Sequence, residues 1–472
     1  MKQLYLFFLF CFLSELSYAQ ISITYTTPND TRPPQIVKKK DGNYWVVINQ
    51  MDRTLRPIAS FAKIFEMNAR GAFVDSVIIK KKNQSFTTNR LIPVSDGFIT
   101  LGSLTNDSDN QAFFTATRFD KHLRAIQDTL LPISGIENFP AFAVDQDSTI
   151  IFNQRGSDRD NYFGKMDKNG TIKFWKRDSS LSGFIGHTLI VRKDSLLYTI
   201  FLTYQFITLD TAFNKKHESQ GIRDNIGIST NIVPLTDSTV CIAGKAYSGN
   251  GWRHFFGIKK LTGEAIFTNL YSMSRDTPIW GASVNCIDTT KLGEWYWGGT
   301  YNYNAFAGGI DLSSSYFLLH KLNKNYSTKW TKKYGGDAYY EMYGVLAKDD
   351  GGCLMYGTRY DYNNTPKFDA YILNVDAEGV ITSESSIPLN MPTITAYPNP
   401  GNGQLSFKVP PSVFGQIDLA VFDISGKLVY QKKEAALSET FDLSNLPNGN
   451  YLYQIFQDGT PLSVGKWQKI GN

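Results

Sequence analysis

The sequence predicts an all-β protein, in which a seven-bladed β-propeller is followed by a small immunoglobulin-like β-sandwich. Three observations lead to this prediction. A turn followed by a short apolar strand recurs about every 50 residues, helical periodicity is almost absent, and a second strand pattern begins after a proline-bearing segment near residue 390. With 472 residues, 42% of them hydrophobic, the chain is long enough for a repeat fold and a further domain.

Each repeat begins with a turn that leads into an apolar strand. The seven copies start at Asp41, Asp96, Asp147, Asp194, Asp237, Gly293 and Asp350. Asp accepts hydrogen bonds from the backbone two residues on and Gly supplies positive φ, so short strands can reverse tightly. A second strand and further apolar runs bring each unit to about four strands, as in a propeller blade. Because the sixth copy is irregular, six and eight blades remain alternatives.

The repeat resembles the degenerate propeller repeats of secreted bacterial proteins, in which an Asp-Gly-Gly strand precedes an Asp-x-x-Gly hairpin. Asp350-Gly351-Gly352 and Asp376 to Gly379 show the pattern most fully. The resemblance covers about Pro34 to Ser386 and implies a fold without a particular activity. The signature boxes of kelch and sialidase propellers are not met.

The N-terminus has the pattern of a signal peptide. Lys2 is followed by an apolar stretch from Leu4 to Leu13, and Ser17-Tyr18-Ala19 supplies the small residues of a cleavage site before Gln20. We therefore expect a signal peptide at 1–19, a propeller at 20–386, a linker at 387–395 and a C-terminal domain at 396–472. The apolar stretch is too short to span a bilayer, which needs about 20 residues, so no membrane span is expected after cleavage.

The C-terminal segment alternates strands and turns. Along the strand from Tyr451 to Gln457, alternation places Tyr451, Tyr453 and Ile455 on one face, which a sandwich would bury. The segment also carries a set of short motifs, whose residues are Tyr397, Pro398, Asn399, Pro400, Asp423, Gly426, Lys427, Gly449, Tyr451, Lys466 and Lys469.

These motifs resemble the type A C-terminal sorting domain of the type IX secretion system, found on proteins exported by Bacteroidetes-type bacteria. The resemblance implies that the type IX machinery is a partner, that the chain crosses the outer membrane to be secreted or held at the cell surface, and that the tail is removed. It often also implies attachment to surface lipopolysaccharide. The one departure from the motif order is Trp467-Gln468 between the two terminal lysines.

Charge and cysteine content exclude several classes of protein. The formal net charge of +5 is small for this length, and no nucleic-acid partner is expected. After signal cleavage three cysteines remain, Cys241, Cys286 and Cys353, with no Cys-x-x-Cys pair. This odd number indicates neither a disulfide framework nor a zinc site, so buried structural thiols are expected.

The sequence contains none of the common catalytic motifs, including His-Glu-x-x-His, Gly-x-Ser-x-Gly and a phosphate-binding Gly-rich loop. Of the five histidines, His187 is the best placed, just before a predicted innermost strand. The acidic segments 106–110 and 158–161 space oxygen ligands as a calcium loop does, but lack the glycine and downstream glutamate of an EF-hand. No metal or cofactor is predicted, and the catalytic residues are left unassigned.

Aromatic residues give the most plausible binding surface. Trp252, Tyr301 and Tyr303 lie in or beside loops rich in Asn and Gly, where flat rings suit stacking on sugars or peptides. Trp295 and Trp297 share one strand face, which favours packing between blades. We therefore hypothesise a non-enzymatic surface protein that binds a glycan or a surface protein. The alternative is an extracellular polysaccharide hydrolase or lyase, because distant residues can meet at a propeller channel.

Overall fold

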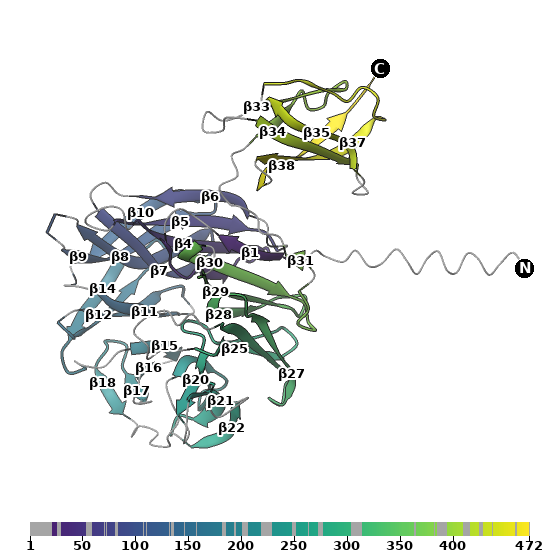
Figure 1. Cartoon of the computed structure of the whole chain (residues 1–472). Helices are drawn as coiled ribbons and strands as arrows, with labels where there is room; N and C mark the ends of the chain where they lie inside the picture. The colour runs from purple at the N-terminus through teal and green to yellow at the C-terminus, as the bar shows by residue number, and fades with distance from the viewer. Residues whose placement is uncertain are drawn as a thin grey trace, which may run out of the picture. The chain divides into compact units, whose positions relative to one another are not determined.

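The computed structural model describes residues 21–471, apart from 26–29, 53–58, 70, 72, 81–83, 107, 110, 132, 134–135, 146, 157, 182–185, 193–194, 201–205, 219–228, 248–251, 263, 272–276, 304–313, 363–364, 382, 385–393, 409–415, 424–427, 437 and 458–459. The predicted signal peptide lies outside this set. The regular structure of the described residues is all β-strand, and none of these residues forms a helix able to cross a membrane. The chain divides into two compact units between Ser386 and Ile387 (Figure 1).

The first unit contains seven sheets within the described residues, and we number these blades in chain order. Blade 1 is formed by β2 (Asp30–Thr31), β3 (Gln35–Lys38), β4 (Tyr44–Asp52), β5 (Ala59–Met67) and β6 (Phe73–Ile79). Blade 2 is formed by β7 (Gln84–Val94), β8 (Gly97–Asn106), β9 (Ala112–Asp120) and β10 (Ala125–Leu131). Blade 3 is formed by β11 (Ile136–Val144), β12 (Ile150–Gly156), β13 (Asn161–Met166) and β14 (Ile172–Asp178).

The remaining blades follow the same order of strands. Blade 4 is formed by β15 (Gly186–Arg192), β16 (Ser195–Ile200), β17 (Phe206–Leu209) and β18 (Lys215–Glu218). Blade 5 is formed by β19 (Ser229–Pro234), β20 (Thr239–Tyr247), β21 (Trp252–Lys260) and β22 (Ala265–Tyr271). Blade 6 is formed by β23 (Ile279–Gly281), β24 (Ile287–Thr289), β25 (Trp295–Tyr301), β26 (Tyr316–Leu322) and β27 (Thr328–Gly335). Blade 7 is formed by β28 (Tyr339–Ala347), β29 (Cys353–Asp361), β30 (Thr365–Val375), β1 (Ile21–Tyr25) and β31 (Ser383–Glu384).

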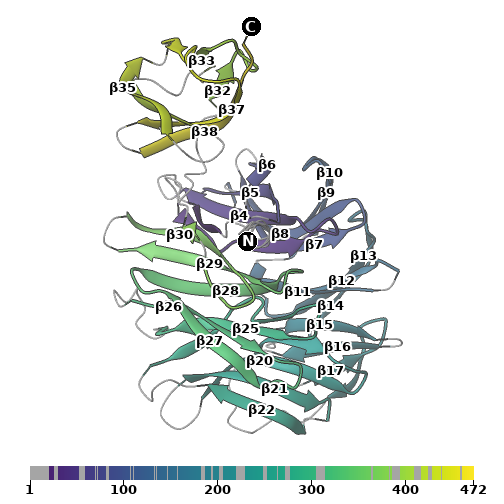
Figure 2. The same ribbon diagram turned by 90° about the vertical axis from the view of Figure 1, so that its right-hand side faces the viewer.

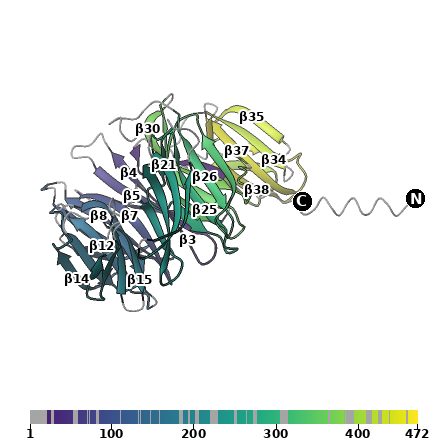
Figure 3. The same cartoon turned by 90° about the horizontal axis from the view of Figure 1, so that it is seen from below.

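The blades follow one another around a common channel, which is lined by residues from the first strands of the blades. In Figures 2 and 3 the chain passes from blade to blade, and in Figure 2 green β30 returns beside purple β4. Within the described residues this confirms the predicted propeller with seven blades. The sixth repeat is irregular because the first strand of blade 6 is split into β23 and β24.

The N-terminal strand closes the ring, which the sequence analysis did not predict. β1 pairs antiparallel with β30, with Ser22 opposite Leu373 and Thr24 opposite Tyr371. At its end, Tyr25 reaches blade 1, where its hydroxyl accepts a hydrogen bond from Gln50 Nε2 at 2.8 Å. The last blade therefore contains the first strand of the chain and touches the first blade, so the ring is held together by strand pairing and by side-chain contact.

The turns follow the predicted chemistry. Asp41 Oδ1 accepts a hydrogen bond from the amide of Asn43 at 3.0 Å, and Asp350 Oδ1 accepts one from the amide of Gly352 at 2.9 Å. The intervening residues, Gly42 and Gly351, have φ of 86° and 85°. These values lie in the left-handed region that glycine adopts without steric penalty. The repeated Asp and Gly therefore set the position of each reversal.

Each blade has extra residues in its first strand relative to the second. In blade 2 Thr88 pairs with Gly102 and Arg90 with Leu101, so Asn89 is the extra residue of a β-bulge. His187, Thr230 and Tyr343 are the corresponding residues of blades 4, 5 and 7. In blades 1, 3 and 6 the pairing of the first strand with the second is interrupted at residues 32–34, 138–140 and 282–286. Each interruption contains more residues than the stretch of the second strand that it faces.

Glycines in the second strands make room for these bulges. A Cβ atom on Gly102 would lie 1.9 Å from the carbonyl oxygen of Thr87, and one on Gly357 would lie 2.0 Å from that of Glu341. Gly299 meets the carbonyl of Trp280 in the same way, at 2.5 Å. Since real Cβ atoms do not approach this closely, the glycines permit the close approach of the two backbones.

The core lies between neighbouring blades. Trp45 of blade 1 packs against Phe98 of blade 2 with ring centroids 4.8 Å apart, and both are under 5% exposed. Burying side chains of this size contributes about 1.5–3 kcal/mol each. Trp295 and Trp297 are also buried, which confirms their predicted packing role. Cys241, Cys286 and Cys353 are buried, as predicted.

The second unit is a β-sandwich of two sheets in its described residues. One sheet consists of β32 (Thr395–Tyr397), β33 (Gln404–Lys408) and β36 (Phe441–Asp442). The other has the order β35 (Leu428–Ala436), β34 (Gln416–Asp423), β37 (Gly449–Gln457) and β38 (Thr460–Lys469). Tyr451, Tyr453 and Ile455 are buried whereas Leu452 is exposed, so the predicted alternation is confirmed.

Candidate functional site

The Tyr-Pro-Asn-Pro motif of the C-terminal unit is hydrogen bonded to the last strand. Trp467 Nε1 donates to the carbonyl oxygen of Pro398 at 2.9 Å. Asn399 donates to the carbonyl of Lys466 and accepts from the amide of Gln468, both at 2.9 Å. The first motif and the last strand, whose bonded residues are 69 positions apart in the chain, therefore form one structural unit.

Trp467 and Gln468, the departure from the motif order, make two of these bonds. The Trp467 side chain is 1% exposed and lies in the sandwich core, with its ring centroid 6.0 Å from that of Tyr451. Tyr451 donates its hydroxyl to the carbonyl of Pro447 at 2.6 Å, and Lys469 Nζ donates to the carbonyls of Ser444 and Leu446. Gly426 and Lys427 lie outside the described residues.

The predicted binding residues do not form one group. Tyr301 ends β25 and is partly buried, and the Nζ atom of Lys333 lies 4.3 Å from its ring centroid. Trp252 begins β21 in blade 5, and its side chain lies outside the described set. Tyr303, two residues past β25, is half-buried and lies against Trp280 with ring centroids 4.9 Å apart. Among the described residues, the ring of Tyr301 contacts that of Tyr316, whereas the ring of Tyr303 contacts those of Trp280 and Tyr339.

Tyr303 belongs to a cluster of aromatic and acidic side chains that we call the Glu341 cluster: Trp280, Tyr303, Tyr339, Glu341 and Tyr343. The Glu341 carboxyl accepts hydrogen bonds from the hydroxyls of Tyr303 and Tyr343. The ring of Tyr303 also lies 6.4 Å from that of Tyr339. The cluster joins blades 6 and 7, since Trp280 comes from β23 while Glu341 and Tyr343 come from β28.

The electrostatics of the cluster centre on the carboxyl group. Burial raises the pKa of Glu341 to about 7, although the hydrogen bonds from the two tyrosines act to lower it. Burial and the negative charge of Glu341 raise the pKa of Tyr303 and of Tyr343. The nearby charge of exposed Arg32, from blade 1, partly offsets the increase for Tyr343. A carboxyl group that changes its charge near neutral pH therefore lies among half-buried aromatic rings.

The sequence analysis missed Trp280, Glu341 and Tyr343. A local signal existed in the run Tyr339-Tyr340-Glu341-Met342-Tyr343, which places one carboxylate within an aromatic first strand next to the glycine of a bulge. Its connection through Tyr303 to Trp280, about 60 residues earlier in the chain, depends on the packing of blade 6 against blade 7.

Two of the five histidines and the second acidic segment have structural surroundings. His254 and His320 are fully buried, and His187 lies in β15 with a side chain outside the described set. In the second acidic segment, Asp160 accepts a hydrogen bond from Arg177 Nε at 2.6 Å. The described residues include no group of three or more His, Cys, Asp or Glu that could hold a metal ion.

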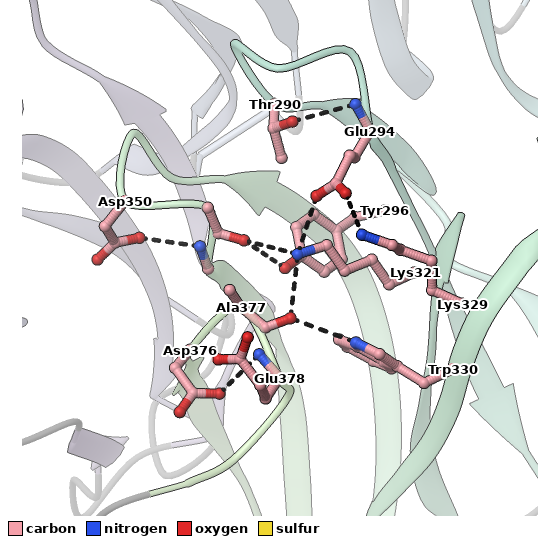
Figure 4. A network of polar contacts seen from close by, with 12 residues as sticks. Thr290, Glu294, Tyr296, Lys321, Lys329, Trp330, Asp350, Asp376, Ala377 and Glu378 are labelled. Carbon is pink, nitrogen blue, oxygen red and sulfur yellow. Dashed lines mark hydrogen bonds and ion pairs between the residues drawn. The ribbon is translucent and has the colours of Figure 1, made fainter. Parts of the chain in front are cut away.

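A polar network joins blades 6 and 7 at their turns (Figure 4). The Nζ atom of Lys321 lies 3.1 Å from the Glu294 carboxylate and donates to the carbonyls of Ala377 at 3.0 Å and Gly351 at 3.3 Å. Trp330 Nε1 also donates to the carbonyl of Ala377, at 3.2 Å. This network ties the two turns of blade 7 to Lys321 and Trp330 of blade 6.

Seven blades around a channel define the first unit as a β-propeller. The second unit matches the family model described as the secretion system C-terminal sorting domain, over residues 395–467. The chain therefore carries a type IX sorting domain and is exported to the cell surface or secreted. No curated protein matches the chain.

Several solved structures are similar to the chain. The β-propeller domain of the Trilobed protease from Pyrococcus furiosus covers 75% of this chain and 97% of its own, with 10% identity and a TM-score of 0.43. The WD40 domain of SCAP from fission yeast covers 74% and 96%, with 8% identity and a TM-score of 0.37. A protein of unknown function from Bacteroides caccae covers 57% and 89%, with 12% identity and a TM-score of 0.38.

Proposed function

We propose that this exported propeller is a non-enzymatic binding protein and that the Glu341 cluster binds a glycan. The observation that supports this function is the contact of Glu341 with Tyr303 and Tyr343, together with the packing of the Tyr303 ring against Trp280. Aromatic faces stack on the apolar faces of sugar rings, while a carboxylate accepts hydrogen bonds from sugar hydroxyls. One cluster on adjacent blades therefore offers both kinds of contact.

The proposal is tested with a glycan array and the mature chain from Gln20. We expect Trp280→Ala and Tyr303→Ala each to weaken binding to the recognised glycan by about fivefold, because a stacked ring contributes roughly 1 kcal/mol. Tyr316→Ala is the matched control, since Tyr316, at the start of β26, packs against Tyr301 and does not belong to the Glu341 cluster. Loss of binding in the control alone, or no glycan bound by the wild-type protein, would count against the proposal.

The charge of Glu341 gives a second readout. As the pH rises through about 7 the carboxyl ionises and becomes a stronger hydrogen-bond acceptor, so affinity for a neutral glycan should increase between pH 6 and pH 8. Glu341→Gln should remove this dependence. An equally steep pH profile in this variant would show that another group is responsible.

The alternative is a polysaccharide hydrolase or lyase that uses Glu341 for proton transfer. The raised pKa of Glu341 favours this candidate, because general acid-base groups work best near the operating pH. Reducing-sugar and unsaturated-uronate assays on purified polysaccharides distinguish the two. Turnover that Glu341→Gln abolishes while binding persists would establish the enzyme and exclude the purely binding role.

A further inference from the structure

The propeller channel contains a cavity whose lining differs chemically from the Glu341 cluster. It has a volume of about 620 Å³ and is lined by residues of six first strands together with Val284, Asn285 and Tyr356. Most of its wall is aliphatic, with Ile36, Leu91 and Ile232 as examples. Cavities of this size, with apolar walls and a few polar groups, are typical of small-molecule sites.

A cation lies in this wall. Arg90 follows the bulge residue Asn89 in β7, and its side chain lines the cavity while the residue is only 8% exposed. Burial lowers the pKa of Arg90 to about 10, a value at which the guanidinium keeps its charge at neutral pH. A buried guanidinium presents up to five donors in a planar fork that matches a carboxylate.

Tyr356 reaches the same cavity from a second strand. It belongs to β29, and its ring crosses β28 at Gly344, where a Cβ atom would lie 2.3 Å from the Tyr356 hydroxyl oxygen. Because Gly344 is the strand partner of Tyr356 and has no side chain, the ring can lie across the first strand of blade 7. The phenol is 2% exposed, lines the cavity and interacts electrostatically with Arg90.

Other polar residues also line the wall: Gln35, Asn231, Asn285 and Lys38, whose ammonium group is paired with Asp349. Asn231 donates to the side-chain oxygen of Asn285, and Asn285 Nδ2 donates to the carbonyl of Val345 at 2.6 Å. These bonds hold two side chains from neighbouring blades in one orientation on the cavity wall. The cavity therefore combines a cation, a phenol and oriented amides with apolar surface.

We propose that the channel binds a small organic carboxylate with an apolar body, whose carboxylate pairs with Arg90 and Tyr356. An anion suits this position because charge-assisted hydrogen bonds to a guanidinium are strong where water is excluded. The apolar body would contact the aliphatic wall and add to the affinity in proportion to the area that it buries. This site is separate from the Glu341 cluster and does not depend on the function proposed for it.

The test uses the mature chain with benzoate and hexanoate as probes, in calorimetric titration at constant ionic strength. Benzyl alcohol and hexanol are the neutral controls. We expect saturable binding of a carboxylate that is at least about tenfold tighter than that of its alcohol, the effect of one charge-assisted bond. Equal affinity for acid and alcohol, or saturable binding of neither carboxylate, would overturn the proposal.

Variants locate the site. Arg90→Met should remove carboxylate binding, Arg90→Lys should retain part of it, and Tyr356→Phe should weaken it while leaving a folded protein. Trp280→Ala in the Glu341 cluster should leave it unchanged. Undiminished binding in both Arg90→Met and Tyr356→Phe, or tighter binding of inorganic phosphate than of either carboxylate, would contradict the assignment. Should Arg90→Met fail to fold, the comparison of Arg90→Lys and Tyr356→Phe with the wild-type chain decides the question.

Discussion

The imidazole of His254 stacks on the indole of Trp297 with ring centroids 4.0 Å apart, and His320 stacks on the same indole at 4.3 Å. All three side chains are fully buried. His254 Nε2 lies 3.0 Å from the carbonyl oxygen of Gly298, so this nitrogen carries the proton and donates. Burial lowers the pKa of His254 well below its usual range and lowers that of His320 to about 3.

The two histidines should make the propeller acid-sensitive. Below about pH 6.5 the unfolded chain binds protons at both residues while the folded chain does not, so the free energy of unfolding falls as the pH decreases. The expected slope is about 1.4 kcal/mol per pH unit for each histidine in this window. Urea unfolding between pH 7.5 and pH 5 checks it. His254→Phe with His320→Phe should give a shallower slope than the wild type, and an unchanged slope would refute the assignment.

Bulge glycines should be intolerant of any side chain. In Gly102→Ala the new Cβ would meet the carbonyl of Thr87, so the two strands must separate, and we expect a loss of about 3 kcal/mol or more in unfolding free energy. Gly42→Ala is the control. Its φ of +86° is unfavourable for alanine but no atom lies within 4 Å, so the loss should be about 1 kcal/mol. Denaturant titration of both variants measures the two losses of unfolding free energy. A larger loss in Gly42→Ala than in Gly102→Ala would contradict the prediction.

Removing the closing strand should destabilise the whole propeller. A chain in which residues 20–25 are replaced by a Gly-Ser segment of equal length loses the pairing with β30 and the contact between Tyr25 and Gln50. Differential scanning calorimetry should show a melting temperature lower by several degrees, because one blade then has an unpaired edge. A melting temperature equal to that of the wild type would show that closure by β1 contributes nothing measurable.

The network of Figure 4 gives a matched pair of lysines. The Lys321 side chain is 5% exposed and Lys329 is 46% exposed, yet both contact Glu294. Lys321→Met should lower the unfolding free energy by about 1–3 kcal/mol, since it removes a buried donor from two carbonyls and a carboxylate. Lys329→Met should lower it by less than about 1 kcal/mol because its ion pair is solvated. Similar losses of unfolding free energy in the two variants would argue against a stabilising role for the buried part of this polar network.

Local sequence predicted the repeating part of the fold well. The turns at Asp41 and Asp350 depend on residues at most two apart, so the strand-turn pattern follows from the sequence, whereas the choice of seven blades over six or eight needed the structure. The sorting motifs could also be recognised from the sequence, because each is a short run of residues close together in the chain. The packing of Trp467 against Tyr451 shows why the residues between the terminal lysines are part of the domain core.

Contacts between blades could not be predicted in the same way. Tyr303 was chosen for its place in a loop, whereas its partners Trp280 and Glu341 come from first strands of two blades. Likewise, Arg90 and Tyr356 are brought to one cavity by ring closure and by the absence of a side chain at Gly344. No short window of sequence contains either group.

By itself, the sequence determined the all-β class, the repeat of turns and strands, and the sorting domain, because hydrogen bonding between near neighbours governs those features. The tertiary structure was needed to show that β1 closes the ring, that Glu341 meets Tyr303, and that Arg90 lines the channel. These depend on the ring, which places side chains hundreds of residues apart within a few ångströms of each other.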